Sequence, residues 1–258
     1  MRSSPHLATV GDFMGNFFYY FCRELFLLPL RPFSRFYYEE MGEIPRDGSA
    51  LILCNHISHA DPPYISRGFP RVVHYMADKP LLDIPVFGKM MKWGHVFPID
   101  RTKSDRATIK TTLGRLTSGN VVCIFPEGGI RHGATSVLGG AELPIGTPAL
   151  WKLANVPVIP MIIIGSDQMY SLKNYWRRPR VFVRVGKVIP ADKSATKEEL
   201  RDRVSAAWRE IFESMKKDYN IQPEELPHSA QYRWGQPESA PVQSKFFQPV
   251  KKGGSPEE

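Results

Sequence analysis

The stretch ALILCNHISHAD, residues 50–61, joins a short apolar run to a cluster of polar side chains. Ala50–Cys54 is rich in residues that favour strands, and we predict a strand there. Its apolar residues follow one another without polar alternation, as is typical of a strand buried on both faces of a sheet. The polar residues after it would then lie on a loop at a strand end, where α/β proteins gather their functional groups.

Further β-rich runs of this kind occur at Val72–Ala77, Val96–Ile99, Val121–Phe125, Val158–Ile164 and Val181–Val185. Helices are predicted between and after them, at residues 104–118, 148–154 and 197–217. The last is the clearest, because Thr196 and Glu199 have the spacing of a capping box and an apolar stripe follows. This alternation predicts an α/β sandwich with a mixed, largely parallel sheet over residues 45–221.

Residues 1–44 are interpreted as a separate N-terminal segment. Within it, residues 13–30 (FMGNFFYYFCRELFLLPL) are strongly aromatic, but Arg23 and Glu24 interrupt the apolar pattern, so a membrane-spanning helix is not expected. On a helix, a polar stripe through Arg23 lies apart from an apolar face through Phe21. We predict an amphipathic helix that docks in the membrane interface. A helix packed on the protein's own core is the alternative.

The chain has 258 residues, 42% of them hydrophobic and 23% charged, which excludes wholesale disorder. Its net charge is +8, and the basic excess falls in residues 46–221. An anionic partner is therefore expected: a phospholipid surface, a phosphorylated substrate, an acidic carrier or nucleic acid. Three cysteines cannot form a disulfide framework and fit a reducing compartment. Prolines and polar residues dominate residues 222–258, for which we predict an extended or disordered tail.

The candidate catalytic pair is His56 and Asp61, which follow the first predicted core strand with the spacing H-x4-D. If residues 57–61 turn back, the carboxylate can bind Nδ1–H of the imidazole and leave Nε2 as an acceptor. Such a histidine is a general base for a hydroxyl group. The pair alone is weak evidence, since a capping aspartate and a loop histidine are common.

Two other strand ends add to this pair. FPIDR, residues 97–101, ends in Arg101, and FPEGGIR, residues 125–131, carries Glu127, Gly128 and Arg131. Glycines allow backbone N–H groups to approach a ligand, and the arginine fork fits phosphate. Together the three strand ends predict group transfer onto a hydroxyl of a phosphorylated acceptor.

Other interpretations of the same residues remain possible at this level. His56, His59 and Asp61 form an H-x2-H-x-D cluster that resembles a metal site, but a fourth ligand is not evident and a hydroxyl acceptor needs no metal. Cys54 beside His56 resembles a thiol–histidine pair, although its place in an apolar strand favours a buried core cysteine. We therefore predict neither a metal nor a cofactor.

Residues 168–191 contain six basic side chains and no acidic ones, with Tyr170, Tyr175 and Trp176 interleaved among them. This combination is compatible with nucleic acid, with an anionic lipid surface or with the phosphates of a thioester donor. A solvated surface is the further alternative. Membrane or donor binding is favoured by the strand-end motifs, and nucleic acid is not predicted as a partner.

The segments NHISHAD, FPIDR, IFPEGGIR and VPVIP occur in this order and resemble the four blocks of the glycerolipid acyltransferase family, which includes 1-acylglycerol-3-phosphate acyltransferases and other lysophospholipid acyltransferases. The resemblance covers roughly residues 45–190. It implies transfer of a fatty acyl group from acyl-CoA or acyl carrier protein to the free hydroxyl of a 1-acylglycerol 3-phosphate or similar lysophospholipid, without an acyl-enzyme. It also implies a role in phospholipid biosynthesis.

The resemblance assigns a role to each matching residue. His56 would be the base and Asp61 the group that orients it. The acceptor phosphate would be bound by Arg101 and Arg131, in a pocket shaped by Glu127 and Gly128. The acyl-donor site would be shaped by Val156, Pro157 and Pro160. The protein would be membrane-associated, monotopic or peripheral, with its active site on the cytoplasmic face.

The chain departs from the family pattern in the third block. The usual E-G-T-R-S is replaced by Glu127-Gly128-Gly129-Ile130-Arg131, so the arginine comes one residue later. Ile145 stands where a basic residue often precedes the glycine. Both changes leave the acceptor headgroup open, and glycerol 3-phosphate or another lysophospholipid is the alternative acceptor. A catalytically weak lipid-binding protein on the same scaffold is the alternative from another functional class.

Overall fold

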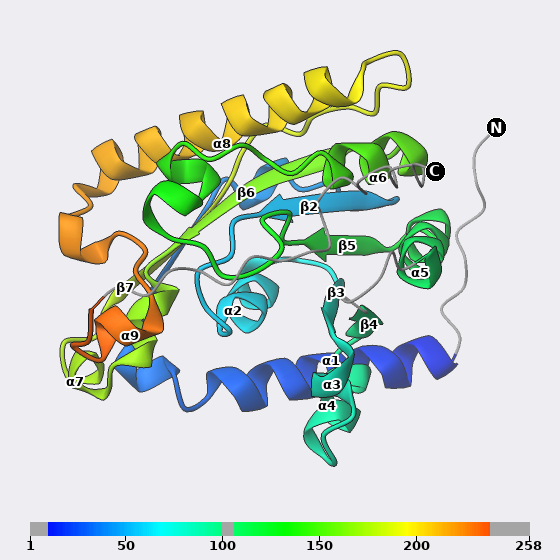
Figure 1. Cartoon of the computed structure of the whole chain (residues 1–258). Coiled ribbons are helices and arrows are strands. Elements are labelled where there is room, and N and C mark those ends of the chain that lie inside the picture. The colour runs from blue at the N-terminus through cyan, green and yellow to red at the C-terminus, as the bar shows by residue number, and fades with distance from the viewer. Residues whose placement is uncertain (1–9, 100–105, 238–258) are drawn as a thin grey trace, which may run out of the picture.

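The computed structural model describes residues 10–99 and 106–237. Within these ranges, seven strands form one sheet in the order β1-β7-β6-β2-β5-β3-β4 (Figure 1). The strands are β1 (Arg35–Glu39), β2 (Ala50–Cys54), β3 (Val73–Asp78), β4 (Phe97–Ile99), β5 (Val121–Ile124), β6 (Val158–Ile164) and β7 (Arg180–Val185).

Strand β2 lies at the centre of the sheet, parallel to both β5 and β6. Strands β3 and β4 run in the same direction as β5. Strand β7 is antiparallel to β6, and β1 is parallel to β7. The sheet is therefore mixed and largely parallel, which confirms the predicted α/β class. Because β2, β5 and β6 are parallel, the segments that follow them leave the sheet at one edge.

Helices cover both faces of the sheet (Figure 1). The α-helices are α1 (Val10–Leu27), α2 (Asp61–Gly68), α3 (Lys79–Leu82), α4 (Phe87–Trp93), α5 (Arg106–Thr117), α6 (Gly146–Ala154), α7 (Leu172–Tyr175), α8 (Lys197–Tyr219) and α9 (Ala230–Arg233). Short 3₁₀ helices are η1 (Arg31–Phe33), η2 (Met41–Glu43), η3 (Gly133–Thr135), η4 (Val137–Gly139), η5 (Ser166–Tyr170) and η6 (Pro223–Glu225). Helices α1 and α2 contribute to the core on one face, and α5, α6 and α8 to the core on the other.

Strand β2 explains why the sheet has a core on each side. Ile52 and Cys54 join the core with α2, whereas Leu51 and Leu53 join the core with α8, since successive side chains of a strand point to opposite faces. All five residues of β2 are buried. On the α8 side, the indole Nε1–H of Trp208 donates to the Leu53 carbonyl at 3.1 Å. The uninterrupted apolar run thus reflects burial on two faces, as predicted.

The start of α8 follows the predicted capping box. The Thr196 hydroxyl accepts from the Glu199 amide at 3.1 Å, and the Glu199 carboxylate accepts from the Thr196 amide at 2.7 Å. These two bonds satisfy N–H groups that the first helical turn leaves without partners. The helix therefore begins where the sequence predicts, at Lys197.

Strand β1 was not predicted from the sequence. RFYYE carries charges at both ends and forms an edge strand whose side chains are half-buried or exposed, so its apolar pattern is weak. Its place is fixed by long-range contacts: Tyr37 stacks on Phe182 of β7, and Glu39 pairs with Arg184. Residues 35–39, which we assigned to the N-terminal segment, are thus part of the main sheet.

Helix α1 packs on the body of the protein through α2 and α4. Tyr19, Cys22 and Leu27 are buried in this contact, and the Arg23 guanidinium donates to the Ser66 carbonyl at 3.3 Å. Phe21, on the face predicted to be apolar, is 52% exposed. In the described part of the chain, no helix combines the length and the apolarity that a membrane crossing requires.

The described part of the C-terminal region, residues 222–237, is folded onto the domain rather than extended. It contains η6 and α9, and two of its side chains form ion pairs with the body: Glu225 with Arg180, and Arg233 with Asp167. Charged and polar contacts of this kind leave no apolar periodicity, so the composition pointed to disorder. Residues 238–258 lie outside the described residues.

Candidate active site

The loop that leaves β2 is anchored by Asn55. This fully buried side chain bridges β2 to β6: its Nδ2 donates to the Ile163 carbonyl at 2.9 Å, and its Oδ1 accepts from the Ile163 amide at 2.8 Å. The amide group thus extends the pairing of the two strands by one residue. His56 follows at once and therefore starts from a fixed backbone position.

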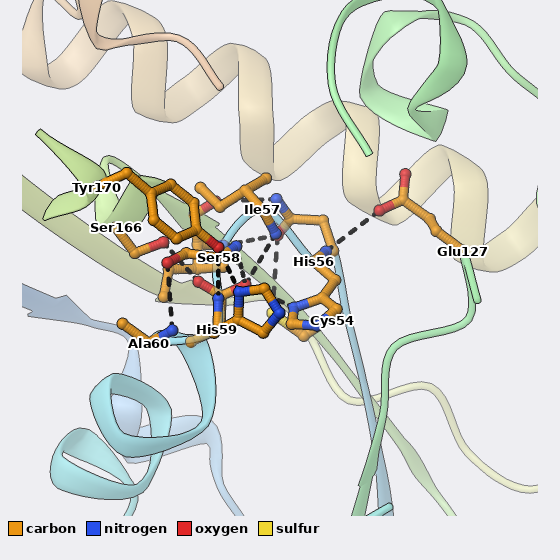
Figure 2. A network of polar contacts seen from close by, with 12 residues as sticks. Cys54, His56, Ile57, Ser58, His59, Ala60, Glu127, Ser166 and Tyr170 are labelled. Atoms are coloured by element: carbon orange, nitrogen blue, oxygen red, sulfur yellow. Dashed lines mark hydrogen bonds and ion pairs between the residues drawn. The ribbon is translucent and has the colours of Figure 1, made fainter. Parts of the chain in front are cut away.

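His56 and Asp61 form the predicted pair. The imidazole Nδ1 lies 2.8 Å from Asp61 Oδ2, and the same oxygen accepts from the amides of Ile57 at 2.8 Å and Ser58 at 2.9 Å (Figure 2). The loop therefore wraps around one carboxylate oxygen. A carboxylate on Nδ1–H fixes the tautomer in which Nε2 carries the lone pair.

The Asp61 carboxylate is fully buried and is held from two sides. It opens helix α2, where the positive end of the helix dipole favours a negative charge. Its second oxygen, Oδ1, accepts from the Ser166 hydroxyl at 2.5 Å, and Ser166 follows β6 in η5. A buried charge needs such partners, because each donor replaces a lost bond to water.

The His56 ring is oriented by an aromatic neighbour. It stacks on Phe125 with 4.1 Å between the ring centroids, and its side chain keeps 15% of its exposure. Phe125 follows β5, the strand next to β2 in the sheet. The imidazole is thus held on one edge by a carboxylate and on one face by a ring.

Glu127 connects the loop after β2, residues 55–61, to the segment after β5. Its Oε2 accepts from the His56 amide at 3.2 Å, and its Oε1 accepts from the Ser136 hydroxyl and the Val137 amide, both at 2.8 Å. Burial raises the pKa of Glu127, and these donors lower it in part. These contacts connect the loop at His56 with the loop at Ser136 and Val137. The resemblance assigns Glu127 to the phosphate pocket.

The altered third block lies directly beside His56. The Arg131 amide donates to the His56 carbonyl at 2.9 Å. Arg131, which comes one residue later than in the family pattern, is thus hydrogen-bonded to the loop after β2. Gly128 has a φ of 70°, a left-handed conformation that a side chain would strain. This glycine lets the chain turn sharply after Glu127, and the turn brings Arg131 back toward β2.

The remaining predicted site residues are Arg101 and the three residues predicted for the acyl-donor site. Arg101 lies outside the described residues. Val156 and Pro157 precede β6, and Pro160 is buried within it opposite Leu53. Since β6 is parallel to β2, Val156 and Pro157 lie toward the end of the strands away from His56, with Val156 about 20 Å along the strand from Ile163. Pro160 lies beside Leu53, three residues before His56 in the chain.

Three side chains of this region were not predicted: Asn55, Ser166 and Tyr170. The Tyr170 hydroxyl accepts from the His59 amide at 3.0 Å and contacts His59 Nδ1 at 2.6 Å, so the His59 ring is directed to Tyr170 and not to Asp61 (Figure 2). Ser166 follows the predicted strand Val158–Ile164, and its position at a strand end was the available signal. In the described residues, no three histidine, cysteine or acidic side chains are grouped as metal ligands.

Cys54 is a core residue in this structure. It is fully buried, and burial raises the pKa of its thiol well above the ordinary value, so the reactive thiolate is strongly disfavoured. The chemistry that the loop can perform is therefore proton transfer at Nε2 of His56.

Comparison with known proteins connects this geometry to a family. The Acyltransferase family model matches residues 35–164. The 1-acyl-sn-glycerol-3-phosphate acyltransferase of Bacillus subtilis is 30% identical over 57% of this chain and 71% of that protein, and the enzyme of that name from Streptococcus pneumoniae is 27% identical over 85% and 82%.

The fold has a solved relative as well. The 1-acyl-sn-glycerophosphate (LPA) acyltransferase PlsC from Thermotoga maritima superposes with a TM-score of 0.63 and 21% identity, over 78% of this chain and 81% of that one. This likeness shows a shared fold. The family match and the Bacillus subtilis relative confirm the family that the four sequence blocks predicted. The chain belongs to the acyltransferase family and is an acyltransferase enzyme.

Proposed function

We propose that this acyltransferase moves a fatty acyl group from acyl-CoA or acyl carrier protein to the free hydroxyl of a 1-acylglycerol 3-phosphate, as a step of phospholipid biosynthesis. The contact of His56 Nδ1 with the buried Asp61 carboxylate carries this proposal, because it prepares Nε2 to take the hydroxyl proton. The names of the relatives support this acceptor.

In the proposed mechanism, the acceptor hydroxyl oxygen attacks the thioester carbonyl carbon while its proton moves to His56 Nε2. The imidazolium formed in this step is stabilised by the Asp61 carboxylate on Nδ1. The C–S bond then breaks, and the departing thiolate takes the proton from Nε2. The acyl group goes directly to the acceptor, and His56 returns to its neutral form.

The acceptor identity is tested by steady-state turnover with purified protein. We expect a higher kcat/KM with 1-acylglycerol 3-phosphate than with glycerol 3-phosphate or lysophospholipids that carry larger headgroups, each assayed with long-chain acyl-CoA and acyl carrier protein donors. A preference for glycerol 3-phosphate would replace the acceptor in the proposal. Tight vesicle binding without turnover of any pair would instead favour a lipid-binding protein.

We propose that Arg131 binds the acceptor phosphate and that Arg101 assists it. The Arg131 backbone is bound to the His56 carbonyl, and a guanidinium can bind phosphate with two parallel hydrogen bonds. Gly128 supports this role through the turn that it allows, and Glu127 through the loops that it connects.

We expect Arg131→Ala to raise the KM for 1-acylglycerol 3-phosphate by about tenfold or more, with kcat within about threefold, because a charge-assisted contact made equally in ground and transition states is lost. Steady-state kinetics measures both constants. Monoacylglycerol, which lacks the phosphate, is the matched control, and its turnover by the variant should equal that by the unmodified enzyme. An unchanged KM for the phosphorylated acceptor would contradict the assignment.

For the donor, the sheet geometry supports an indirect role of Val156, Pro157 and Pro160. Val156 and Pro157 precede β6 at the end of the sheet away from His56, and Pro160 lies within β6 beside Leu53. We propose that they fix the position of β6, whose other end leads to Ser166 and thus to Asp61.

An apolar surface of α1 and the α3–α4 region supports membrane association. We call this surface the apolar face and define it by exposed side chains: Phe17, Phe21, Leu25, Leu28, Leu81, Ile84, Val86 and Trp93. The two parts are joined by ring contacts, Phe18 on Trp93 and Phe26 on Phe87. We propose that the protein is monotopic or peripheral, docked through this face, with its active site on the cytoplasmic side.

The double variant Phe21→Asp/Leu25→Asp should weaken binding to anionic phospholipid vesicles by at least about tenfold, since each buried apolar side chain contributes about 1.5–3 kcal/mol. Vesicle sedimentation measures the bound fraction. Leu153→Asp is the control, because Leu153 is 65% exposed but lies on α6, on the other side of the sheet (Figure 1). Equal sedimentation of all three proteins would contradict docking through the apolar face.

A further inference from the structure

Residues Pro223–Gly235, which include η6 and α9, lie against the segment that follows β6. We call these residues the C-terminal strap. The Arg233 guanidinium binds the Asp167 carboxylate, with Nε at 2.7 Å and Nη2 at 2.6 Å from Oδ2, and it also donates to the carbonyls of Glu224 and Leu226. One arginine thus connects the two ends of the strap to η5.

The contact with Asp167 is deeply buried. The Asp167 carboxylate is fully buried, and 7% of the Arg233 side chain is exposed. Burial raises the pKa of Asp167 to about 6, while Arg233 and the His228 amide, which donates to Oδ2 at 3.0 Å, act in the opposite direction. An unpaired carboxylate at this depth is costly, so Arg233 is the group that allows Asp167 to carry its charge here.

Asp167 is the direct neighbour of the residue that holds the catalytic carboxylate. Ser166 is fully buried and donates its hydroxyl proton to Asp61 Oδ1. Gly165 precedes it with a φ of 91°, and a Cβ there would lie 2.1 Å from the Arg180 carbonyl, so the turn out of β6 is tight. Movement of Asp167 therefore moves Ser166, and the carboxylates of Asp61 and Asp167 repel each other.

The strap reaches the catalytic loop by a second route. The Trp234 indole Nε1–H donates to the Tyr170 carbonyl at 2.7 Å, and the Tyr170 hydroxyl accepts from the His59 amide. Figure 2 shows Tyr170 and Ser166 on the same side of the loop that carries His56. Both routes end within residues 55–61.

We propose that the C-terminal strap positions the His56–Asp61 pair, with Arg233 and Ser166 as its positioning residues. Arg233 acts by neutralising Asp167 beside Ser166. Ser166 acts by a hydrogen bond to Oδ1 of Asp61, the carboxylate oxygen that does not contact His56. This inference rests on the proposed role of His56 as base. It adds that the enzyme needs a segment outside the four sequence blocks for full activity.

The test is Arg233→Gln in the full-length enzyme. We expect kcat to fall by about tenfold with both KM values within about twofold, since a displaced base slows the chemical step without removing a substrate contact. Without Arg233, Asp167 ionises at a pH above about 6, and its charge then repels Asp61. The ratio of variant to unmodified kcat should therefore fall as the pH rises above about 6. Arg203→Gln, which breaks the surface pair with Asp192, is the matched control and should leave kcat unchanged.

Two more variants separate positioning from general loss of structure. Adding Asp167→Asn to Arg233→Gln removes the unpaired charge, and kcat should return to within about threefold of the unmodified value. The ratio of variant to unmodified kcat should then be the same at every pH. Ser166→Ala removes the hydrogen bond to Asp61 Oδ1, and kcat should fall by about tenfold with both KM values within about twofold, because the base is less well positioned while the substrate contacts remain.

An unchanged kcat in Arg233→Gln would overturn the proposal. It would also be overturned if kcat of the double variant were no higher than that of Arg233→Gln. If Arg233→Gln fails to fold, an unchanged kcat in Ser166→Ala would overturn it instead. Neither result touches the role of His56, which is tested by its own replacement.

Discussion

Replacement of His56 by alanine is expected to lower kcat for acyl transfer by about a hundredfold to ten-thousandfold, the range that a general base contributes. The Nε2 atom is the proton acceptor in the proposed mechanism, and the other basic side chains of the loop do not replace it, because His59 is directed to Tyr170. Turnover of 1-acylglycerol 3-phosphate with acyl-CoA measures the loss.

The fold should survive this change, because the His56 side chain is partly exposed and makes one stacking contact and one carboxylate contact. Circular dichroism and vesicle sedimentation should match those of the unmodified protein. Added imidazole should restore part of the rate, since the space left beside Asp61 opens to solvent. Turnover within about tenfold of normal would remove His56 from the mechanism.

Replacement of Asp61 by asparagine is expected to lower kcat by a similar factor, about a hundredfold or more, through a different cause. An asparagine oxygen can still accept from the amides of Ile57 and Ser58, so the loop geometry is largely kept. The negative charge that stabilises the imidazolium is lost. The amide nitrogen also turns Ser166 from a donor into an acceptor.

Asp192→Asn is the matched control for this variant. Asp192 also accepts backbone N–H groups, from Ser194 and Ala195, but its side chain is partly exposed and it lies before α8, away from the site. Its replacement should leave kcat unchanged. If Asp61→Asn keeps more than about a tenth of normal kcat, the carboxylate is not the partner on which the base depends.

The central strands could be predicted from the sequence because burial on two faces leaves a local signal. The bounds of β2 and β6 match the predicted runs 50–54 and 158–164, and α8 begins where the capping box predicts. The pairing of His56 with Asp61 could also be predicted from their spacing. A loop over residues 57–61 is long enough to bring the Asp61 carboxylate back to the His56 imidazole.

The contacts that complete the site could not be predicted in this way. Ser166 reaches Asp61 across 105 residues, and Arg233 reaches Asp167 across 66 residues. Such pairs are single polar contacts with no periodic neighbours, so neither composition nor pattern identifies them. The same holds for β1, an edge strand whose half-exposed residues look like loop until Tyr37 meets Phe182.

Glu127 illustrates the difference between a motif and its role in a given chain. Its position in the third block suggested the phosphate pocket, yet both carboxylate oxygens accept hydrogen bonds from loop residues, Oε2 from His56 and Oε1 from Val137. The third block thus includes a residue that connects two loops, and its role at the acceptor phosphate stays a prediction.

The most direct test of acyl transfer without an acyl-enzyme is a single-turnover experiment with a donor labelled in its acyl group. The protein is mixed with the labelled thioester, with and without 1-acylglycerol 3-phosphate, and label is measured in lipid and in denatured protein. We predict label in phosphatidic acid when the acceptor is present, and none on the protein in either sample. Label on the protein without acceptor, or no labelled phosphatidic acid from folded enzyme, would contradict direct transfer through His56.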